Sequence, residues 1–61
     1  MNKKLKGKIV ERFGTQSDFA HKIGVDESVV SRVVRERIIL DSKIQKKWAR
    51  VLKCRAEELF G

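Results

Sequence analysis

The stretch TQSDFAHKIGVDESVVSRVVRER, residues 15–37, decides the fold of this chain. It contains two apolar patterns with helical spacing, one on each side of a glycine. In the first pattern, Phe19, Ala20 and Ile23 share one face of a helix. Gly24 ends that helix, because glycine adopts a left-handed turn at the lowest cost. The stretch therefore predicts two short helices joined by a tight turn at Val25.

The second helix of the pair, about Glu27 to Arg37 with Asp26 as its N-cap, separates apolar from polar residues. Successive residues turn by about 100° around a helix axis. One side then collects Val29, Val30, Val33 and Val34, and the other collects Glu27, Ser28, Ser31, Arg32 and Arg35. A strand is excluded, because pairs of valines alternate with pairs of polar residues and break the period of two. We expect a buried wall of valines and an exposed polar stripe.

A further helix is predicted before this pair, over residues 3–13. Asn2 is a favoured N-cap residue and Gly14 a favoured C-terminal stop. One face is apolar and consists of Leu5, Ile9 and Phe13. Most of the remaining surface is basic and carries Lys3, Lys4, Lys6, Lys8 and Arg12.

Two helices are predicted after the pair. Ser42 and Gln45 have the spacing of an S-x-x-Q capping box and predict a helix that begins there. Its apolar face consists of Ile44, Trp48, Val51 and Leu52. A short turn at Lys53 and Cys54 precedes a last helix at RAEELF, residues 55–60.

Composition and charge limit the functions that this chain can have. Its 61 residues suffice for one domain, residues 1–61, and they carry 15 Lys and Arg against 8 Asp and Glu, a net charge of +7. A small domain this basic is typical of proteins that bind DNA, RNA or an acidic membrane surface. The single Cys54 cannot form an intramolecular disulfide and suits a reducing cytoplasm. No motif assembles a nucleophile, a metal site or a phosphate loop, so we predict no enzyme activity, no metal and no cofactor.

Three segments, TQSDFAHKIGV, VVSRV and WARVLKCRAEELFG, together resemble the Cro and phage-repressor (XRE-like) helix-turn-helix family. The resemblance runs from about Leu5 to Phe60. It implies an all-α, compact five-helix domain of lambda-repressor-like type, with the helix-turn-helix formed by helices 2 and 3. The second helix of such a pair enters the major groove of DNA. The chain departs from the family at VRERIILD, where polar loop residues are usual, and at Lys53, where glycine is common.

The resemblance implies roles for residues of the pair. The base-reading positions are Glu27, Ser28, Ser31 and Arg32. Phosphate contacts are expected from Thr15, Gln16 and Arg35, and the charges beside the groove add Arg37 and Lys43. Chemistry agrees with these roles, since arginine donates two hydrogen bonds to guanine O6 and N7, and glutamate accepts one from cytosine N4.

The predicted function is a sequence-specific regulator that binds double-stranded DNA as a homodimer in the cytoplasm, associated with the nucleoid. The dimer interface is predicted at the apolar run Ile38, Ile39 and Leu40, because exposed apolar clusters mark interfaces. A second candidate surface is Leu59 with Phe60. Three alternatives stay open: an antitoxin-like protein-binding regulator, the DNA-binding part of a longer repressor, and a non-specific nucleic-acid binder.

Overall fold

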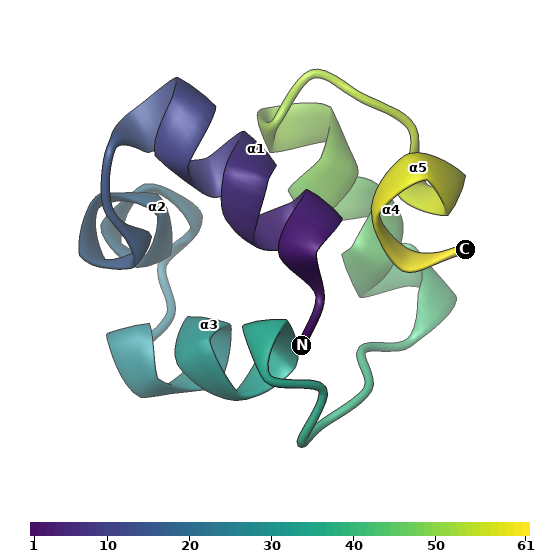
Figure 1. The fold of residues 1–61 in the computed structure, drawn as a ribbon, viewed down its shortest axis with the longest axis horizontal. Coiled ribbons are helices and arrows are strands. Elements are labelled where there is room, and N and C mark those ends of the chain that lie inside the picture. Colours follow the sequence, from purple (N-terminus) through teal and green to yellow (C-terminus); the bar gives the residue numbers. More distant parts are fainter.

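In the computed structural model, which describes residues 1–61, the chain forms five α-helices and no strands (Figure 1). The helices are α1 (Lys3–Phe13), α2 (Gln16–Ile23), α3 (Glu27–Val34), α4 (Ser42–Val51) and α5 (Ala56–Phe60). The molecule measures 23 × 23 × 20 Å. The predicted all-α, five-helix fold is confirmed. No helix combines the length and the apolar composition needed to cross a membrane.

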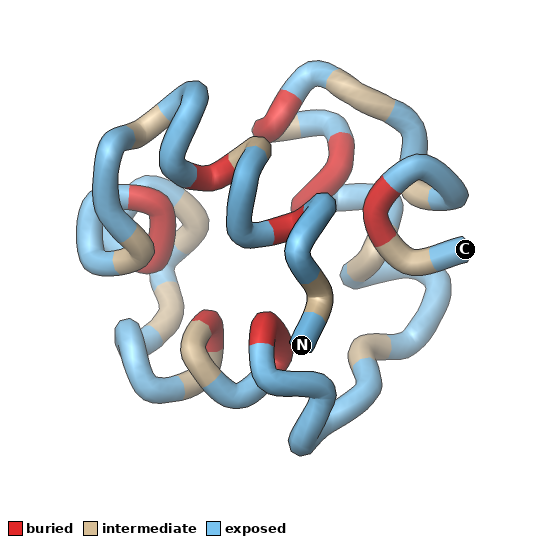
Figure 2. Tube along the Cα trace, in the orientation of Figure 1, coloured by how far each residue is buried: buried red, intermediate tan, exposed pale blue.

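One apolar core holds the helices together, and its side chains come from all five of them (Figure 2). Its buried members are Leu5, Ile9, Phe19, Ala20, Val30, Val33, Val34, Trp48, Ala49, Leu52 and Leu59. At the centre, the ring of Phe19 meets that of Trp48 edge-on, with centroids 5.3 Å apart and an interplanar angle of 82°. Phe19 is 0% exposed, so its replacement by alanine should cost about 3–5 kcal/mol of folding free energy.

Helix α1 lies across the middle of the molecule and packs against α2, α3 and α5 (Figure 1). Helix α2 packs on α3, and α4 packs on α5. The residue that begins α1 also ties it to its neighbours. Asn2 Oδ1 accepts the backbone N–H of Leu5 at 3.0 Å, which confirms the predicted N-cap, and the Asn2 backbone N–H donates to the carbonyl oxygen of Val34 at 2.6 Å.

The turns between the first three helices are as predicted. Gly14 has a φ of 87° and Gly24 a φ of 77°, a region that L-residues with a Cβ rarely adopt. At the start of α2, Thr15 Oγ1 accepts the backbone N–H of Asp18 at 3.1 Å. Each glycine therefore lets the chain change direction within a few residues, and α2 packs against both α1 and α3.

The end of α3 differs from the prediction. The helix stops at Val34 rather than at Arg37. Glu36 has a φ of 62°, its N–H donates to the carbonyl of Val33, and the N–H of Arg37 donates to that of Arg32. This is a Schellman ending with a glutamate at the left-handed position that glycine usually occupies. The terminal ammonium of Met1 pairs with the Glu36 carboxylate at 3.1 Å.

The predicted capping box of α4 is wrong by one residue. The N-cap is Asp41, whose Oδ1 accepts the backbone N–H of Ile44 at 2.9 Å. Gln45 does not reach back to Ser42, because its Nε2 donates to the carbonyl oxygen of Leu40 at 3.0 Å. Two side-chain hydrogen bonds, one made by Asp41 and one by Gln45, therefore fix the loop before α4.

The packing of the chain gives no reason for Gly7, in the middle of α1. Gly7 is exposed, and a Cβ built on it would have no atom within 4 Å. A glycine inside a helix costs roughly 0.5–1 kcal/mol of stability relative to alanine.

Candidate nucleic-acid interface

Helix α3 has one buried and one exposed side. Val30, Val33 and Val34 are at most 4% exposed and belong to the core, with Val29 packed beside them. The other side presents the predicted stripe: Glu27, Ser28, Arg32 and Arg35 are exposed, and Ser31 is half-buried. The α2–α3 turn consists of residues 24–26. This arrangement leaves the outer side of α3 open to a partner.

The hydroxyl group of Ser28 is already engaged inside the protein. Its Oγ donates to Asp26 Oδ2 at 2.5 Å. Asp26 occupies the N-cap position of α3, as predicted, but its side chain bonds to no backbone N–H of the helix. Because the proton of Ser28 is committed, the Ser28 oxygen can only accept from a base, such as from the amino group of cytosine or adenine.

The candidate phosphate contacts lie on three segments of the chain. Thr15 and Gln16 begin α2, Arg35 and Arg37 follow the last turn of α3, and Lys43 lies in the first turn of α4. A helix N-terminus carries partial positive charge that suits an anion, although the N-cap side chains of Thr15 and Asp41 already accept the N–H groups of Asp18 and Ile44. The side chain of Gln16 makes no hydrogen bond within the protein, and it is half-buried.

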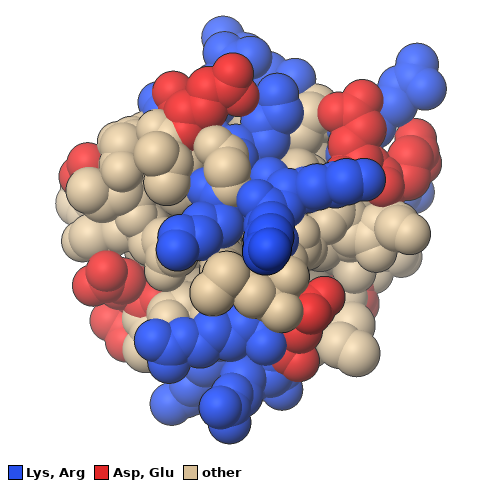
Figure 3. Space-filling model, viewed as in Figure 1, with Lys and Arg blue, Asp and Glu red and all other residues tan.

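Cationic side chains on these segments are free of ion pairs. The two ion pairs in the structure are Met1 with Glu36 and Lys8 with Glu11. Figure 3 shows Lys and Arg gathered in two areas of one face, one over α1 and one over α3 at the bottom of the view. The exposed charges of Arg32, Arg35 and Arg37 are therefore available to an external polyanion.

The apolar run after α3 is only partly exposed. Ile39 is 90% exposed and Ile38 is 40% exposed, whereas Leu40 is half-buried and packs against the core. Ile38, Ile39 and Leu40 line a hollow of about 240 Å³ together with Val33 and Phe60. The two candidate pairing surfaces, Ile38–Leu40 and the C-terminal end, are thus one surface. Leu59 is not part of it, because it is only 4% exposed and belongs to the core.

No other part of the chain assembles reactive groups. Burial raises the pKa of the Cys54 thiol, and the carboxylate of Glu58 raises it further, against the opposing charges of Lys8 and Arg12. The thiol is therefore protonated at neutral pH and a poor nucleophile. No cluster of three or more His, Cys, Asp or Glu side chains is placed to hold a metal ion.

Comparison with protein-family models finds one match, described as a protein of unknown function (DUF739), over residues 2–59. The matched residues include all five helices except for the last residue of α5. No curated protein and no solved structure matches the chain significantly.

Proposed function

The chain belongs to the DUF739 family, whose function is unknown, and we propose that it is a sequence-specific, double-stranded-DNA-binding transcription regulator of the Cro or repressor type. It acts by occupancy: bound to its operator, it excludes polymerase or another regulator, and it catalyses no reaction. The resemblance of its helix-turn-helix and of its C-terminal half to lambda-repressor-like domains supports this proposal.

One observation carries the proposal. Helix α3 is fixed to the core by Val30 and Val33 and presents Glu27 and Arg32 to solvent from its other side. An α-helix held in this way fits the major groove of B-DNA, which is about 12 Å wide. Arg32 pairs with guanine and Glu27 with cytosine, while Ser28 accepts from an amino group. These contacts read the base sequence.

Affinity comes chiefly from charge. The net charge is +7, and the segments beside α3 contribute the unpaired cations Arg35, Arg37 and Lys43. Cations that neutralise phosphates release counterions from the DNA, and this release strengthens binding to every sequence. Phosphate contacts also fix the register in which α3 lies in the groove.

The regulator acts as a homodimer in the cytoplasm, associated with the nucleoid. One copy reads one face of the groove, which is too short a site to specify a single operator. Two copies related by a two-fold axis read two half-sites about 34 Å apart. The hollow beside Ile39 is the proposed pairing surface.

Selection from a pool of random double-stranded DNA tests the proposal. The full chain should enrich sequences with a near-palindromic motif whose half-sites lie about 10 base pairs apart, one helical turn. A variant with Glu27, Ser28 and Arg32 all replaced by alanine should fold, as judged by circular dichroism, and enrich no motif. Equal binding of random DNA or RNA by the wild type would contradict sequence-specific recognition.

A further inference from the structure

The outer side of α4 carries a row of cations, of which the proposed operator contacts use only the first. Lys43, Lys47 and Arg50 recur at i, i+4 and i+7, so they fall within about 60° of one another around the helix axis. All three are exposed. They lie opposite the side that packs into the core through Trp48 and the following Leu52. These three residues are called the α4 row below.

The segment that contains the α4 row is the most positive part of the chain. Residues 42–55 hold six Lys and Arg and no Asp or Glu. By contrast, residues 15–37, the predicted helix-turn-helix, hold four of each sign and are neutral overall. Neither of the two ion pairs in the structure involves α4. The attraction of a polyanion to this protein is therefore directed at α4 more than at α3.

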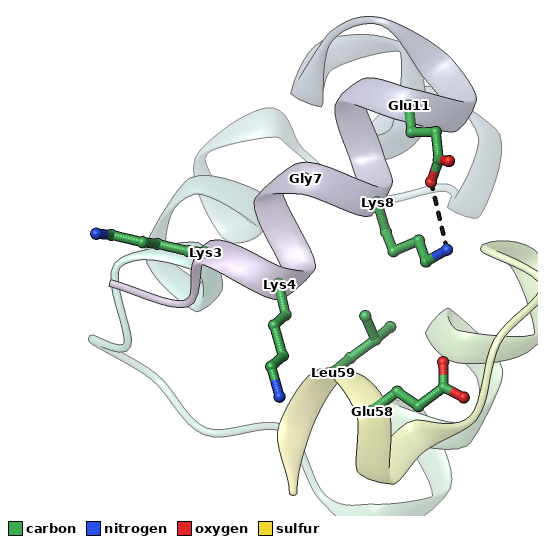
Figure 4. A pocket seen from close by; sticks show the side chains of 7 residues that line it. All are labelled: Lys3, Lys4, Gly7, Lys8, Glu11, Glu58 and Leu59. Carbon is green, nitrogen blue, oxygen red and sulfur yellow. Dashed lines mark ion pairs between the residues drawn. The ribbon is translucent and has the colours of Figure 1, made fainter.

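The α4 row places like charges next to one another. Lys43 with Lys47, and Lys47 with Arg50, stand at the i,i+4 and i,i+3 spacings, at which like charges destabilise a helix. On α1 the cations are interrupted by an acid: Figure 4 shows the carboxylate of Glu11 paired with Lys8, at 3.3 Å. Helix α4 contains no carboxylate, so an anion from outside the helix relieves this repulsion.

Two acidic residues flank α4 but form no ion pair with the row. Asp41 is the N-cap, and its Oδ1 accepts the backbone N–H of Ile44. Glu57 lines a hollow between α4 and α5 together with Lys46, the remaining cation of α4. Lys46 thus lies on the α5 side of the helix and is left out of the α4 row. The three cations of the row stay free of ion pairs within the protein.

The chemistry of the row fits the phosphates of a duplex. Single-stranded nucleic acids stack their bases on exposed aromatic rings, but the aromatic ring of α4, Trp48, is only 2% exposed. Helices that lie on membranes insert their apolar side into the lipid, and α4 has most of that side in the core. From Lys43 to Arg50 the row is about 10 Å long. One strand of DNA carries a phosphate about every 3.4 Å of the duplex axis, so three cations meet about three phosphates.

The row extends away from the helix proposed to read bases. In Figure 1, α3 lies at the bottom of the molecule, and the connection that follows α4 passes over the top of the view. Lys43, in the first turn of α4, is the member of the row nearest to the α3–α4 connection in sequence. Lys47 and Arg50 belong to the later turns, which lead away from α3.

We propose that the α4 row binds the phosphate backbone of double-stranded DNA of any sequence, independently of α3. The inference rests on the proposed function for the kind of polyanion, duplex DNA. Helix α3 selects the sequence, whereas the α4 row supplies affinity for DNA that lacks an operator.

The test measures binding of the full chain to a fluorescent duplex of random sequence at several salt concentrations. The double variant Lys47→Gln, Arg50→Gln should bind about tenfold or more weakly at low salt, and the slope of log affinity against log salt should become shallower by about two. Its matched control is Lys3→Gln, Lys6→Gln, which removes an equal charge from exposed positions of α1. That control should keep the wild-type slope.

Two further variants separate the α4 row from α3 and from folding. Replacing Glu27, Ser28 and Arg32 by alanine removes one charge of each sign, so it should leave binding of the random duplex unchanged. Exchanging the two cations, as Lys47→Arg with Arg50→Lys, should keep both the affinity and the slope of the wild type. The glutamine double variant should show no loss of Tm, because it removes like-charge neighbours from an exposed helix side.

Four results would overturn the proposal. The first is an equal change of slope in the α4 and α1 double variants, which would make net charge alone responsible. The second is loss of random-duplex binding in the α3 variant, and the third is a lower Tm in the glutamine double variant or lost binding in the exchanged one. The fourth is equal or tighter binding of single-stranded DNA, duplex RNA or phosphatidylserine vesicles. Failure to enrich an operator motif bears on the proposed function and leaves these outcomes unchanged.

Discussion

The side-chain amide of Asn2 donates a hydrogen bond to the carbonyl oxygen of Leu59 at 2.7 Å and so joins the two ends of the chain. The same side chain caps α1 by accepting the N–H of Leu5. Its backbone N–H donates to Val34, the last residue of α3. Asn2 therefore holds α1, α3 and α5 at one point, and the elements that it joins are far apart in the sequence.

Two substitutions at Asn2 separate its two side-chain bonds. Asn2→Asp keeps the acceptor for Leu5 and removes the donor to Leu59, whereas Asn2→Ala removes both. We expect Asn2→Ala to lower the free energy of unfolding by about 1–3 kcal/mol and Asn2→Asp to lower it by less. Urea unfolding of the three proteins measures this order. Equal reductions in both variants would show that the cap contributes nothing.

Lys53 adopts a left-handed conformation, with a φ of 57°. It closes α4 in a Schellman ending, in which its N–H donates to Arg50 and the N–H of Cys54 donates to Ala49. Lys53→Gly should raise the free energy of unfolding by roughly 0.5–1 kcal/mol, because glycine adopts this φ without steric cost. Thermal unfolding would show a higher Tm. Lys53→Ala is the matched control: it keeps the Cβ and should give no gain.

Lys53 and Glu36 also show where prediction from the sequence stops. The five helices and most of the core follow from apolar periodicity, which is a local property, and Gly14 and Gly24 predict two of the turns. The predicted apolar face of α4 is wrong at Ile44, which is 41% exposed, and it misses Ala49, which is buried. The sequence pattern places the end of α3 three residues too late, because Glu36 carries no local stop signal. Its left-handed turn is accompanied by distant contacts, from Met1 to Glu36 and from Asn2 to Val34.

The candidate site likewise has features that local sequence patterns predict and features that depend on tertiary contacts. The exposed stripe on α3 is predictable, because helical geometry alone determines which residues share a side. The bond from Ser28 to Asp26 is not, since serine and aspartate at this spacing have several partners available to them. The common surface of Ile39 and Phe60 depends on how α5 folds back against the α3–α4 connection. Only the tertiary structure brings those two residues together.

Arg32 is the residue of the stripe best suited to read a base. It is exposed in the last turn of α3 and makes no ion pair. Arg32→Ala should weaken operator binding by roughly 1–3 kcal/mol and relax the preference at one base pair in each half-site. Arg55→Ala, in the α4–α5 connection, removes an equal charge away from α3 and should leave that preference intact. Uniformly weaker binding with unchanged preference would make Arg32 a phosphate contact.

Arg37 and Lys43 are expected to contact phosphates only. Replacing either by glutamine should weaken binding to every DNA sequence alike. The slope of log affinity against log salt concentration should become shallower by about one for each phosphate that is no longer neutralised. Titrations at several salt concentrations, with operator and with random duplex, measure both effects. A slope that matches the wild type in both variants would remove these residues from the interface.

Ile39 is the most exposed large apolar side chain of the chain, at 90%. It borders the hollow that Val33, Leu40 and Phe60 help to line. In a two-fold dimer each copy offers the same surface, so Ile39 of one copy can enter the hollow of the other. Because Ile39 contributes little to the core, Ile39→Asp should leave the helical content and Tm nearly unchanged. It should weaken self-association and cooperative binding to a two-half-site operator.

Leu40→Ala is the matched contrast to Ile39→Asp, because Leu40 packs against the core. That variant should lower the free energy of unfolding by about 1–2 kcal/mol, since its side chain is only partly buried.

Analytical sedimentation over a range of protein concentrations, combined with thermal unfolding, separates the two effects. Ile39→Asp should shift the protein toward monomer at a concentration where the wild type is dimeric, with an unchanged unfolding curve. A wild type that stays monomeric at high concentration and binds each half-site independently would rule out the dimer. Unfolding of the domain by Ile39→Asp would instead place this side chain in the core, against its exposure in the structure.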